Sequence, residues 1–381
     1  MTFRAPPLGV YVHWPYCARI CPYCDFNVVR ERGRTAQKAA LVAAILADLA
    51  AHAALTGPRE LVSIFFGGGT PSLMATDDVA RVIESARALW TPTVGLEVSL
   101  EANPTDAEAA RFAELAAAGV NRLSLGVQSL DDASLALLGR NHAAAAARRA
   151  IDVAAAAFPR LSIDLIYALP GQALDAWARE LAAVAAMGPE HISPYQLTIE
   201  PGAAFQRRVQ RGTLVPVGPD LAAEFYETTR SVLEGAGFEA YEVSNHARGQ
   251  AARSRHNLVY WRGEDYVGAG PGAHGRLTLG GQRFATAAPD AVDAYVARVG
   301  RHGTGTPLEP LEPRDAALER LLMGLRTVEG VALADLAPLA IPTARFEALD
   351  GLVVRSAGRL AATAAGRPVL DRVIAELAGG V

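Results

Sequence analysis

The sequence predicts an α/β protein: a partial (β/α)6 barrel, open and curved, followed by a smaller α+β domain with a winged-helix-like end. Three observations predict this fold. Short runs rich in β-branched residues alternate with longer helical runs from residue 8 onward, as in right-handed βα units on a parallel sheet. Six such units are too few to close an eight-stranded barrel. After about residue 215 the alternation ends, and helical and hairpin-like segments follow.

The expected strands are short apolar runs at residues 8–12, 61–66, 95–102, 122–127, 161–169 and 191–199. The expected helices lie between and after them, near 35–56, 77–90, 106–118, 131–157, 174–187 and 219–236. Thr76 and Thr105 each stand before an acidic residue where a helix N-cap is expected. Each helix then returns the chain to the start of the next parallel strand.

Polar segments follow five of the six expected strands. They read "FFGGGTPS", "EANP", "GVQS", "IDLIYALPG" and "SPYQLTIEP". Parallel α/β folds place their sites at the carboxyl ends of their strands. Because five polar segments meet at that one rim, the sequence predicts a binding or catalytic site there.

Composition excludes several classes of function. The 381 residues carry a formal net charge of -4, which argues against a nucleic-acid binder that relies on positive charge. The only lysine, Lys38, lies in a helical stretch, so neither a lysine Schiff base nor a Walker loop is expected. No apolar run is expected to reach the roughly 18 residues that span a bilayer, and the first residues lack a secretory apolar region. The cytoplasm is the expected compartment.

All three cysteines, Cys17, Cys21 and Cys24, lie in one loop, "CARICPYCDF". A structural zinc site uses four ligands, so a zinc interpretation has to recruit His13 or a distant histidine. A cubane iron–sulfur cluster held by three thiolates instead leaves one iron free to bind a small molecule. The loop follows an expected strand and precedes an expected helix, which places it on the same rim as the polar segments.

The segment "YVHWPYCARICPYCDF", together with "FFGGGTP", resembles the cluster loop and glycine-rich motif of the radical S-adenosylmethionine (SAM) superfamily. The resemblance implies a [4Fe-4S] cluster on the three cysteines, whose open iron binds SAM and whose electron cleaves it to a 5′-deoxyadenosyl radical. It also implies a SAM site made by Tyr11, Tyr23, Gly67, Gly68, Gly69, Thr70, Glu101, Gln128, Arg140 and Asp164. By the same resemblance Tyr11 lies beside the cluster, and Arg140 pairs with a carboxylate.

Within that superfamily the chain resembles the group of oxygen-independent coproporphyrinogen III oxidases and their relatives. The true oxidases carry a fourth cysteine where this chain has Phe26, and a longer segment before the cluster loop. His256, Asn257, Tyr260 and Trp261 form an H-N-x-x-Y-W motif, which resembles the signature of the HemW-type heme chaperones. The resemblance implies that these four residues bind heme, with His256 as a ligand to the iron.

Other residues near this motif are candidate heme ligands or a candidate nucleotide site. His246 and His274 are rival or second ligands to heme. The segment "VGAGPGAHG" at 267–275 resembles a dinucleotide-binding motif, but it runs into a hairpin-like segment where that motif needs a helix. A structural turn, or a wall of the cofactor pocket, is the expected role.

The expected domains are a radical SAM barrel at 1–215 and a C-terminal domain at 216–381, with heme bound near 241–275 and a winged-helix-like module at 312–381. The expected function is a heme chaperone that carries a [4Fe-4S] cluster and SAM and delivers heme to acceptor hemoproteins. The alternatives are a radical SAM enzyme acting on a porphyrinogen or another substrate, and a zinc-stabilised binding module. Expected partners are heme-accepting proteins, membrane-bound respiratory enzymes among them, an electron donor and a second copy in a homodimer. The protein is also expected to contact the inner face of a membrane. It is not expected to bind nucleic acid.

Overall fold

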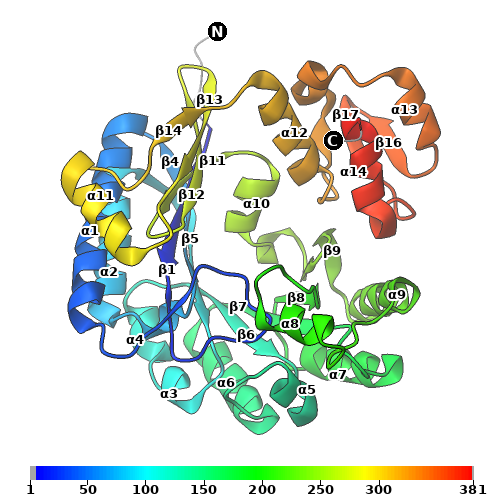
Figure 1. Ribbon diagram of the computed structural model, residues 1–381, viewed down its shortest axis with the longest axis horizontal. Coiled ribbons are helices and arrows are strands. Elements are labelled where there is room, and N and C mark those ends of the chain that lie inside the picture. Colours follow the sequence, from blue (N-terminus) through cyan, green and yellow to red (C-terminus); the bar gives the residue numbers. More distant parts are fainter. Residues whose placement is uncertain (1–5, 380–381) are drawn as a thin grey trace.

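One curved sheet organises the protein (Figure 1). The computed structural model describes residues 6–379 of the 381. Within that range six parallel strands lie side by side in chain order: β1 (Leu8–Trp14), β4 (Glu60–Gly68), β5 (Thr91–Ala102), β6 (Arg122–Gln128), β7 (Arg160–Tyr167) and β8 (His191–Gln196). The predicted α/β class and the order of these strands are confirmed.

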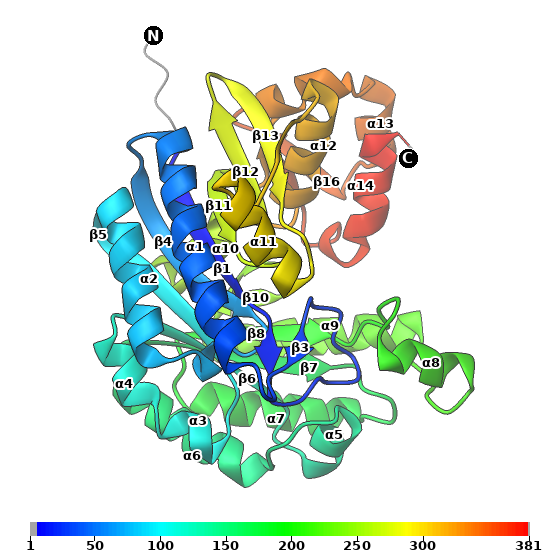
Figure 2. The ribbon, with the colours of Figure 1, turned by 60° about the vertical axis from the view of Figure 1, so that its left-hand side comes forward.

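Helices cover the outer face of the parallel strands (Figure 2). They are α1 (Thr35–Thr56), α2 (Thr76–Leu89), α3 (Asp106–Ala109), α4 (Phe112–Ala117), α5 (Asp132–Leu137), α6 (Ala144–Ala157) and α7 (Leu174–Ala186). Two expected helices are therefore each divided in two. Gly139, whose φ of 67° is typical of a residue that ends a helix, lies in the break between α5 and α6, and this break brings Arg140 to the rim.

The two expected N-caps differ in the structure. Thr105 caps α3, because its hydroxyl accepts a hydrogen bond from Glu108 N at 3.2 Å. Thr76 is instead the first residue of α2, after Ala75, and its hydroxyl accepts a hydrogen bond from Arg111. The expectation that Thr76 caps this helix was wrong.

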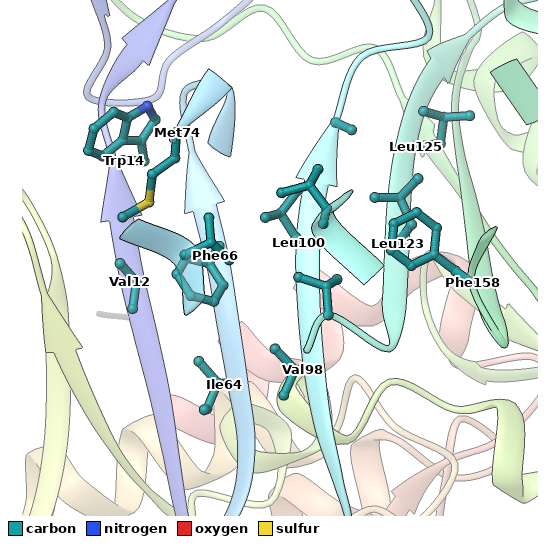
Figure 3. Packing of buried hydrophobic residues seen from close by; sticks show 14 of the residues in the cluster. Val12, Trp14, Ile64, Phe66, Met74, Val98, Leu100, Leu123, Leu125 and Phe158 are labelled. Atoms are coloured by element: carbon teal, nitrogen blue, oxygen red, sulfur yellow. The ribbon is translucent and has the colours of Figure 1, made fainter. Parts of the chain in front are cut away.

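Alternation along each strand separates an apolar outer face from a polar inner face. The outer residues pack under the helices and form the main core; they include Val12, Trp14, Ile64, Phe66, Val98, Leu100, Leu123 and Leu125 (Figure 3). The inner positions of the same strands carry Glu97, Ser99, Glu101, Arg122, Ser124, Ser162 and Asp164. The concave side of the sheet is thus where charged groups gather.

Strands from the second half of the chain extend both edges of this sheet. β11 (Asp265–Ala269) pairs with β1 in parallel, and β12 (His274–Leu279), β13 (Gln282–Ala287) and β14 (Leu308–Pro310) continue antiparallel from it. β10 (Asn245–Ala247) and β9 (Glu239–Glu242) continue antiparallel from β8. The boundary expected at residue 215 falls inside one continuous sheet, and the division into domains stays a prediction.

The remaining elements pack around this sheet and beyond it. They are β2 (Tyr16–Cys17), β3 (Val29–Arg30), α8 (Ala204–Gln210), α9 (Pro219–Gly235), α10 (Arg255–Trp261), α11 (Val292–His302), α12 (Pro313–Gly324), β15 (Val331–Ala332), η3 (Leu333–Leu339), α13 (Thr343–Ala348), β16 (Val353–Ser356), β17 (Arg359–Ala362) and α14 (Leu370–Ala378), with short 3-10 turns η1 (Pro71–Leu73), η2 (Gln250–Ala252) and η4 (Arg367–Val369). α12 to α14 bury a core of their own, with Leu321, Val331, Leu360 and Val373 at its centre. In Figure 1 this C-terminal module lies to one side of the sheet, with α10 between the two. Its assignment as a winged helix stays a prediction.

α1 is, among the described residues, the one helix long and apolar enough to cross a membrane by length and composition. The sequence-based expectation that no segment meets that test was therefore wrong. In the fold its Leu41, Ile45 and Leu49 are fully buried in the main core. Asp48, also buried, accepts hydrogen bonds from the Tyr295 hydroxyl and from Gly305 N, both at 2.8 Å. α1 is thereby fixed to the rest of the protein as a core helix.

Candidate functional site

The three cysteines line one small cavity at the carboxyl ends of the parallel strands. The cavity has a volume of about 140 Å³ and is lined by all three. The loop that carries them starts after β1 and is closed where β2 pairs with β3. Inside it, Cys24 N donates a hydrogen bond to Cys21 O at 3.2 Å. The loop therefore presents its thiols to one enclosed space.

Neighbouring side chains touch two of these thiols. Arg140 Nη1 lies 3.3 Å from Cys21 Sγ, and Thr70 Oγ1 lies 3.6 Å from Cys17 Sγ; both donate to sulfur. Burial raises the pKa of Cys17 to about 11 and also raises the pKa of Cys24, and repulsion between the thiolates adds to both shifts. Three thiolates in such a place need a metal centre to stabilise their charge.

The thiols fit a cluster better than a single zinc ion that recruits His13. In the described part of the chain no three His, Cys, Asp or Glu side chains come close enough to share one ion. A cubane does not require this, since each thiolate binds a separate iron. Both ring nitrogens of His13 are already engaged, Nδ1 with the Tyr11 hydroxyl at 2.9 Å and Nε2 with Asn27 O at 2.8 Å.

The opposite wall of the small cavity comes from the ends of three strands. Glu101, the last residue but one of β5, accepts a hydrogen bond from Gly68 N at 3.2 Å. Asp164 of β7 accepts one from Ser124 Oγ at 2.8 Å. Gln128, with a φ of 67°, ends β6 and lines the same space. These predicted residues are therefore brought together with the cysteines.

Two carboxyl groups in this wall give it an electrostatic preference. Burial and, to a smaller extent, the nearby Asp164 carboxylate raise the pKa of Glu101 to about 8. Burial also raises the pKa of Asp164, against hydrogen bonds that lower it. Two adjacent acidic groups with raised pKa values favour a ligand that brings positive charge.

Arg140 connects the two walls. Its Nη2 donates to Asn103 Oδ1 at 2.5 Å and to Gly126 O at 2.8 Å, while Nη1 donates to the Tyr23 hydroxyl at 3.3 Å. The guanidinium thus spans from the cysteine loop to the ends of β5 and β6. Within residues 6–379 its hydrogen-bond partners are amide, carbonyl, phenol and thiol groups, and its pairing with a carboxylate stays a prediction.

Close packing alone accounts for the three glycines at the end of β4 and directly after it. A Cβ at Gly68 would lie 2.5 Å from the His13 ring, and one at Gly69 would lie 2.7 Å from the Pro15 carbonyl carbon. Gly68 also has a φ of 106°, which disfavours other residues. A Cβ at Gly67 would press on Tyr11 and Phe65. Gly68, Gly69 and Thr70 nevertheless line the small cavity, and their role toward SAM stays a prediction.

Known proteins resemble this chain in sequence and in fold. The sequence model of the Radical SAM superfamily matches residues 11–182. Radical S-adenosyl methionine domain-containing protein 1, mitochondrial, of Bos taurus is 45% identical over 85% of this chain and 74% of its own length. Heme chaperone HemW of Mycobacterium tuberculosis is 37% identical over 98% of this chain and 95% of its own length. The chain belongs to the HemW family of radical SAM proteins.

HemW of Escherichia coli, at 39% identity over 72% of both chains, agrees with this assignment. The solved structure of coproporphyrinogen III oxidase (HemN) from Escherichia coli superposes with a TM-score of 0.82 at 22% identity, over 99% of this chain and 91% of its own. This likeness confirms the fold. Membership of the radical SAM superfamily implies a [4Fe-4S] cluster and SAM, which together supply one-electron chemistry when bound.

The H-N-x-x-Y-W motif lies on α10, whose first turn packs against the concave side of the sheet. His256 is 1% exposed, and its ring lies 4.9 Å from that of Phe65. Its Nδ1 pairs with Ser63 Oγ at 2.8 Å and its Nε2 with the Tyr260 hydroxyl at 2.6 Å. Burial lowers its pKa to about 3. His256 as an iron ligand stays a prediction, and in this geometry its ring positions Tyr260.

The far end of α10 opens onto a second, larger cavity of about 1060 Å³, lined by Tyr260 and Trp261. The predicted SAM residue Tyr11 lines this larger cavity and not the small one. Asn257 lines neither of the two; its backbone N–H donates to the Ser254 N-cap at 3.3 Å. The larger space lies between the β11–β13 hairpins and the C-terminal module, as its lining from α12 and η3 shows.

The two rival histidines have different positions. His246 is 1% exposed on β10 and lines neither cavity. His274 begins β12, is exposed and lines the larger cavity. The segment 267–275 that contains it forms the antiparallel turn between β11 and β12, so the expected structural turn is confirmed.

Sequence reasoning missed Asn103, Ser124 and the position of Phe26. The sheet register places Ser124 opposite Glu101, and Ser124, Gly126 and Gln128 alternate along β6. This period of two was a usable signal in the sequence. Phe26 is 60% exposed and lines both cavities, which no local pattern could have indicated.

Proposed function

We propose that this protein is a heme chaperone that binds heme in the larger cavity and delivers it to acceptor hemoproteins. The observation that carries the proposal is this cavity of about 1060 Å³, in a chain that matches a protein named heme chaperone HemW over nearly its whole length. Cavities of about 300–1,000 Å³ hold cofactor-sized ligands.

The lining of the larger cavity suits a flat apolar molecule with acidic groups. Trp261, Tyr260, Phe26 and Met323 offer aromatic and thioether surface, against which a macrocycle packs well. Arg276 and Arg320 reach the same space, and guanidinium groups bind carboxylates. Such a mixture fits heme, whose ring is apolar and whose side chains include carboxylates.

The small cavity holds the two cofactors of the radical SAM superfamily. Cys17, Cys21 and Cys24 hold the [4Fe-4S] cluster. Tyr23, Gly68, Gly69, Thr70, Glu101, Gln128, Arg140 and Asp164 surround SAM, while Gly67 and Tyr11 support that wall from behind. Glu101 and Asp164 face the cationic groups of SAM, which their raised pKa values favour. No catalytic residue is assigned.

The protein acts in the cytoplasm and meets membrane-bound acceptors from the inner face. It receives electrons from a donor protein and forms a homodimer. The [4Fe-4S] cluster stays exposed to oxygen at its open iron, and work with the protein therefore requires anaerobic reconstitution.

The test is a hemin titration of the anaerobically reconstituted protein, followed by absorbance, and then addition of an apo-hemoprotein acceptor. Saturable binding at one hemin per chain, followed by transfer of the heme absorbance to the acceptor, is expected. Saturable binding without transfer would leave a heme-binding protein that is not a chaperone. No saturable binding would overturn the proposal.

A second candidate, a radical SAM enzyme acting on a porphyrinogen or another substrate, is favoured by one observation. The small cavity keeps its two carboxyls, Arg140 and all three cysteines in one place. Formation of 5′-deoxyadenosine together with conversion of coproporphyrinogen III, under anaerobic conditions with a reductant, would support the enzyme. We expect no such conversion, because Phe26 replaces the additional cysteine of the oxidases.

A further inference from the structure

The histidines that reach the larger cavity differ in whether their rings are free. His13 and His274 both line it. His13 is 5% exposed and has both ring nitrogens hydrogen-bonded. The ring of His274 is exposed and makes no hydrogen bond to any part of the chain from residue 6 to 379. His274 is therefore the imidazole in this cavity that has a nitrogen available to a metal.

Strand geometry directs His274 into the cavity. Successive side chains of a strand point to opposite faces, and His274, Arg276 and Thr278 occupy alternate positions of β12. All three line the larger cavity, while Gly275 and Leu277 between them are buried. An imidazole and a guanidinium group thus project from one face of one strand.

The glycine-rich turn holds His274 in place. A Cβ at Gly268 would lie 2.0 Å from His274 O, and one at Gly275 would lie 2.4 Å from Thr286 Oγ1. Glycine at both positions lets β11, β12 and β13 approach closely around this residue. The turn is also tied to the cluster loop, since Asn27 Nδ2 donates to Pro271 O at 3.1 Å.

Arg276, two residues further along β12, supplies a group for an acidic substituent. Its guanidinium forms a two-pronged ion pair with Glu319 of α12, with the shortest distance 2.6 Å. Its side chain is 20% exposed, so a carboxylate arriving in the cavity can reach it. Arg276 would therefore be available to a carboxylate of a porphyrin bound in this cavity.

We propose that His274 is the protein ligand to the heme iron in the larger cavity, with His256 holding Tyr260 in the wall behind it. This inference rests on the proposed heme binding and adds to it the residue and the face that receive the iron. Imidazole is the commonest protein ligand to heme iron. His274 presents its imidazole from a wall that three strands hold in place. The rest of the cavity is enclosed by α10, the β11–β13 hairpins and the C-terminal module.

The experiment compares hemin titrations of the reconstituted parent protein with those of His274→Ala, His256→Gln and His302→Ala. His302 is an exposed histidine at the end of α11 and serves as the matched control. His274→Ala is expected to lose the absorbance signature of histidine-ligated heme and to bind hemin at least about tenfold more weakly. His302→Ala and His256→Gln are expected to keep the signature.

Added imidazole separates lost ligation from lost folding. In His274→Gly, free imidazole is expected to restore the histidine-ligated spectrum, which a misfolded chain would not allow. An unchanged spectrum in His274→Ala, or loss of the signature in His256→Gln alone, would overturn this inference while heme binding stands. Absence of saturable binding by the parent protein would instead overturn the proposed function itself.

Discussion

The two cavities are built in different ways from one sheet. The small cavity is lined by residues 17–164, which come from the cysteine loop and from consecutive strand ends, and hydrogen bonds fix most of its polar groups. The larger cavity is lined by residues between 6 and 338, from the cluster loop, two hairpins, α10, α12 and η3. The first depends on short motifs within βα units, and the second depends on how distant segments pack together.

The largest expected effect is on the small cavity alone. Replacing all three cysteines by serine removes the thiolates that hold the cluster, so iron and acid-labile sulfide should fall to background after reconstitution. Hemin binding should persist, because none of the cysteines lines the larger cavity. Iron and sulfide analysis and a hemin titration of the same preparation measure both effects.

Loss of hemin binding in this triple variant would show that the two cavities are not independent. The thermal unfolding of the variant, compared with that of cluster-free parent protein, is the control for folding. Retention of stoichiometric iron and sulfide would remove the cysteines as cluster ligands.

Arg140→Leu is the next largest change. It removes a guanidinium that donates to Asn103, Gly126, Tyr23 and Cys21 and leaves those groups without a donor. We expect a loss of about 2–4 kcal/mol in stability. We also expect SAM affinity to fall roughly 30- to 100-fold, equivalent to about 2–3 kcal/mol. Thermal unfolding and SAM titration calorimetry measure the two effects.

Arg149→Leu is the matched control for this prediction. Arg149 lies on α6 with its side chain 59% exposed and forms a surface ion pair with Asp106, which is worth about 0–1 kcal/mol. The control should leave SAM affinity unchanged. Equal effects of the two substitutions would contradict the bridging role of Arg140.

The difference between the cavities also explains which parts of the molecule the sequence could predict. Alternating strands and helices, and the polar segments after them, located the rim, the cysteine loop, Glu101 and Asp164. The contacts of Arg140 with both walls of the small cavity depend on the break at Gly139. From the sequence one continuous helix was expected there, and these contacts were not predicted. The pairing of β11 with β1 joins residues more than 240 positions apart, and no local pattern encodes it. The same pairing places His274 and Phe26 at one cavity.

Glu101 makes the small cavity sensitive to pH in the absence of SAM. Its folded pKa of about 8 lies above its usual value, so the folded protein keeps a proton that the unfolded chain loses at lower pH. The stability this group contributes is present below about pH 4.5 and is lost as pH rises through 8. At pH 8.5 Glu101→Gln should therefore be more stable than the parent protein by on the order of 2 kcal/mol and should unfold at a higher temperature. At pH 5 the two proteins should unfold at similar temperatures.

Glu319→Gln is the control from the larger cavity. Glu319 is paired with Arg276, so its replacement should lower and not raise the unfolding temperature at pH 8.5. Both variants are measured without SAM, with the cluster state matched to the parent protein. A destabilised Glu101→Gln at pH 8.5 would mean that the carboxylate is stabilised in the folded protein, contrary to this prediction.

The smallest expected effect belongs to Phe26, which touches both cavities. Phe26→Ala should change stability by less than about 0.5 kcal/mol, because the side chain is largely exposed. It should weaken hemin binding by roughly three- to tenfold, since the loss of one aromatic contact costs about 0.5–1.5 kcal/mol. SAM affinity should change less, because the opposite wall of the small cavity is held by hydrogen bonds.

Ile20→Ala is the matched control for Phe26→Ala. Ile20 is an exposed apolar residue of the same loop, 37% exposed, and it lines the small cavity but not the larger one. Hemin affinity should therefore be unchanged in Ile20→Ala and reduced in Phe26→Ala. Equal hemin affinity in both variants would show that Phe26 does not contact the porphyrin. If Phe26→Ala weakens SAM binding more than hemin binding, the main contact of Phe26 lies in the small cavity. Phe26, which replaces the oxidase cysteine, would then have a role in binding SAM.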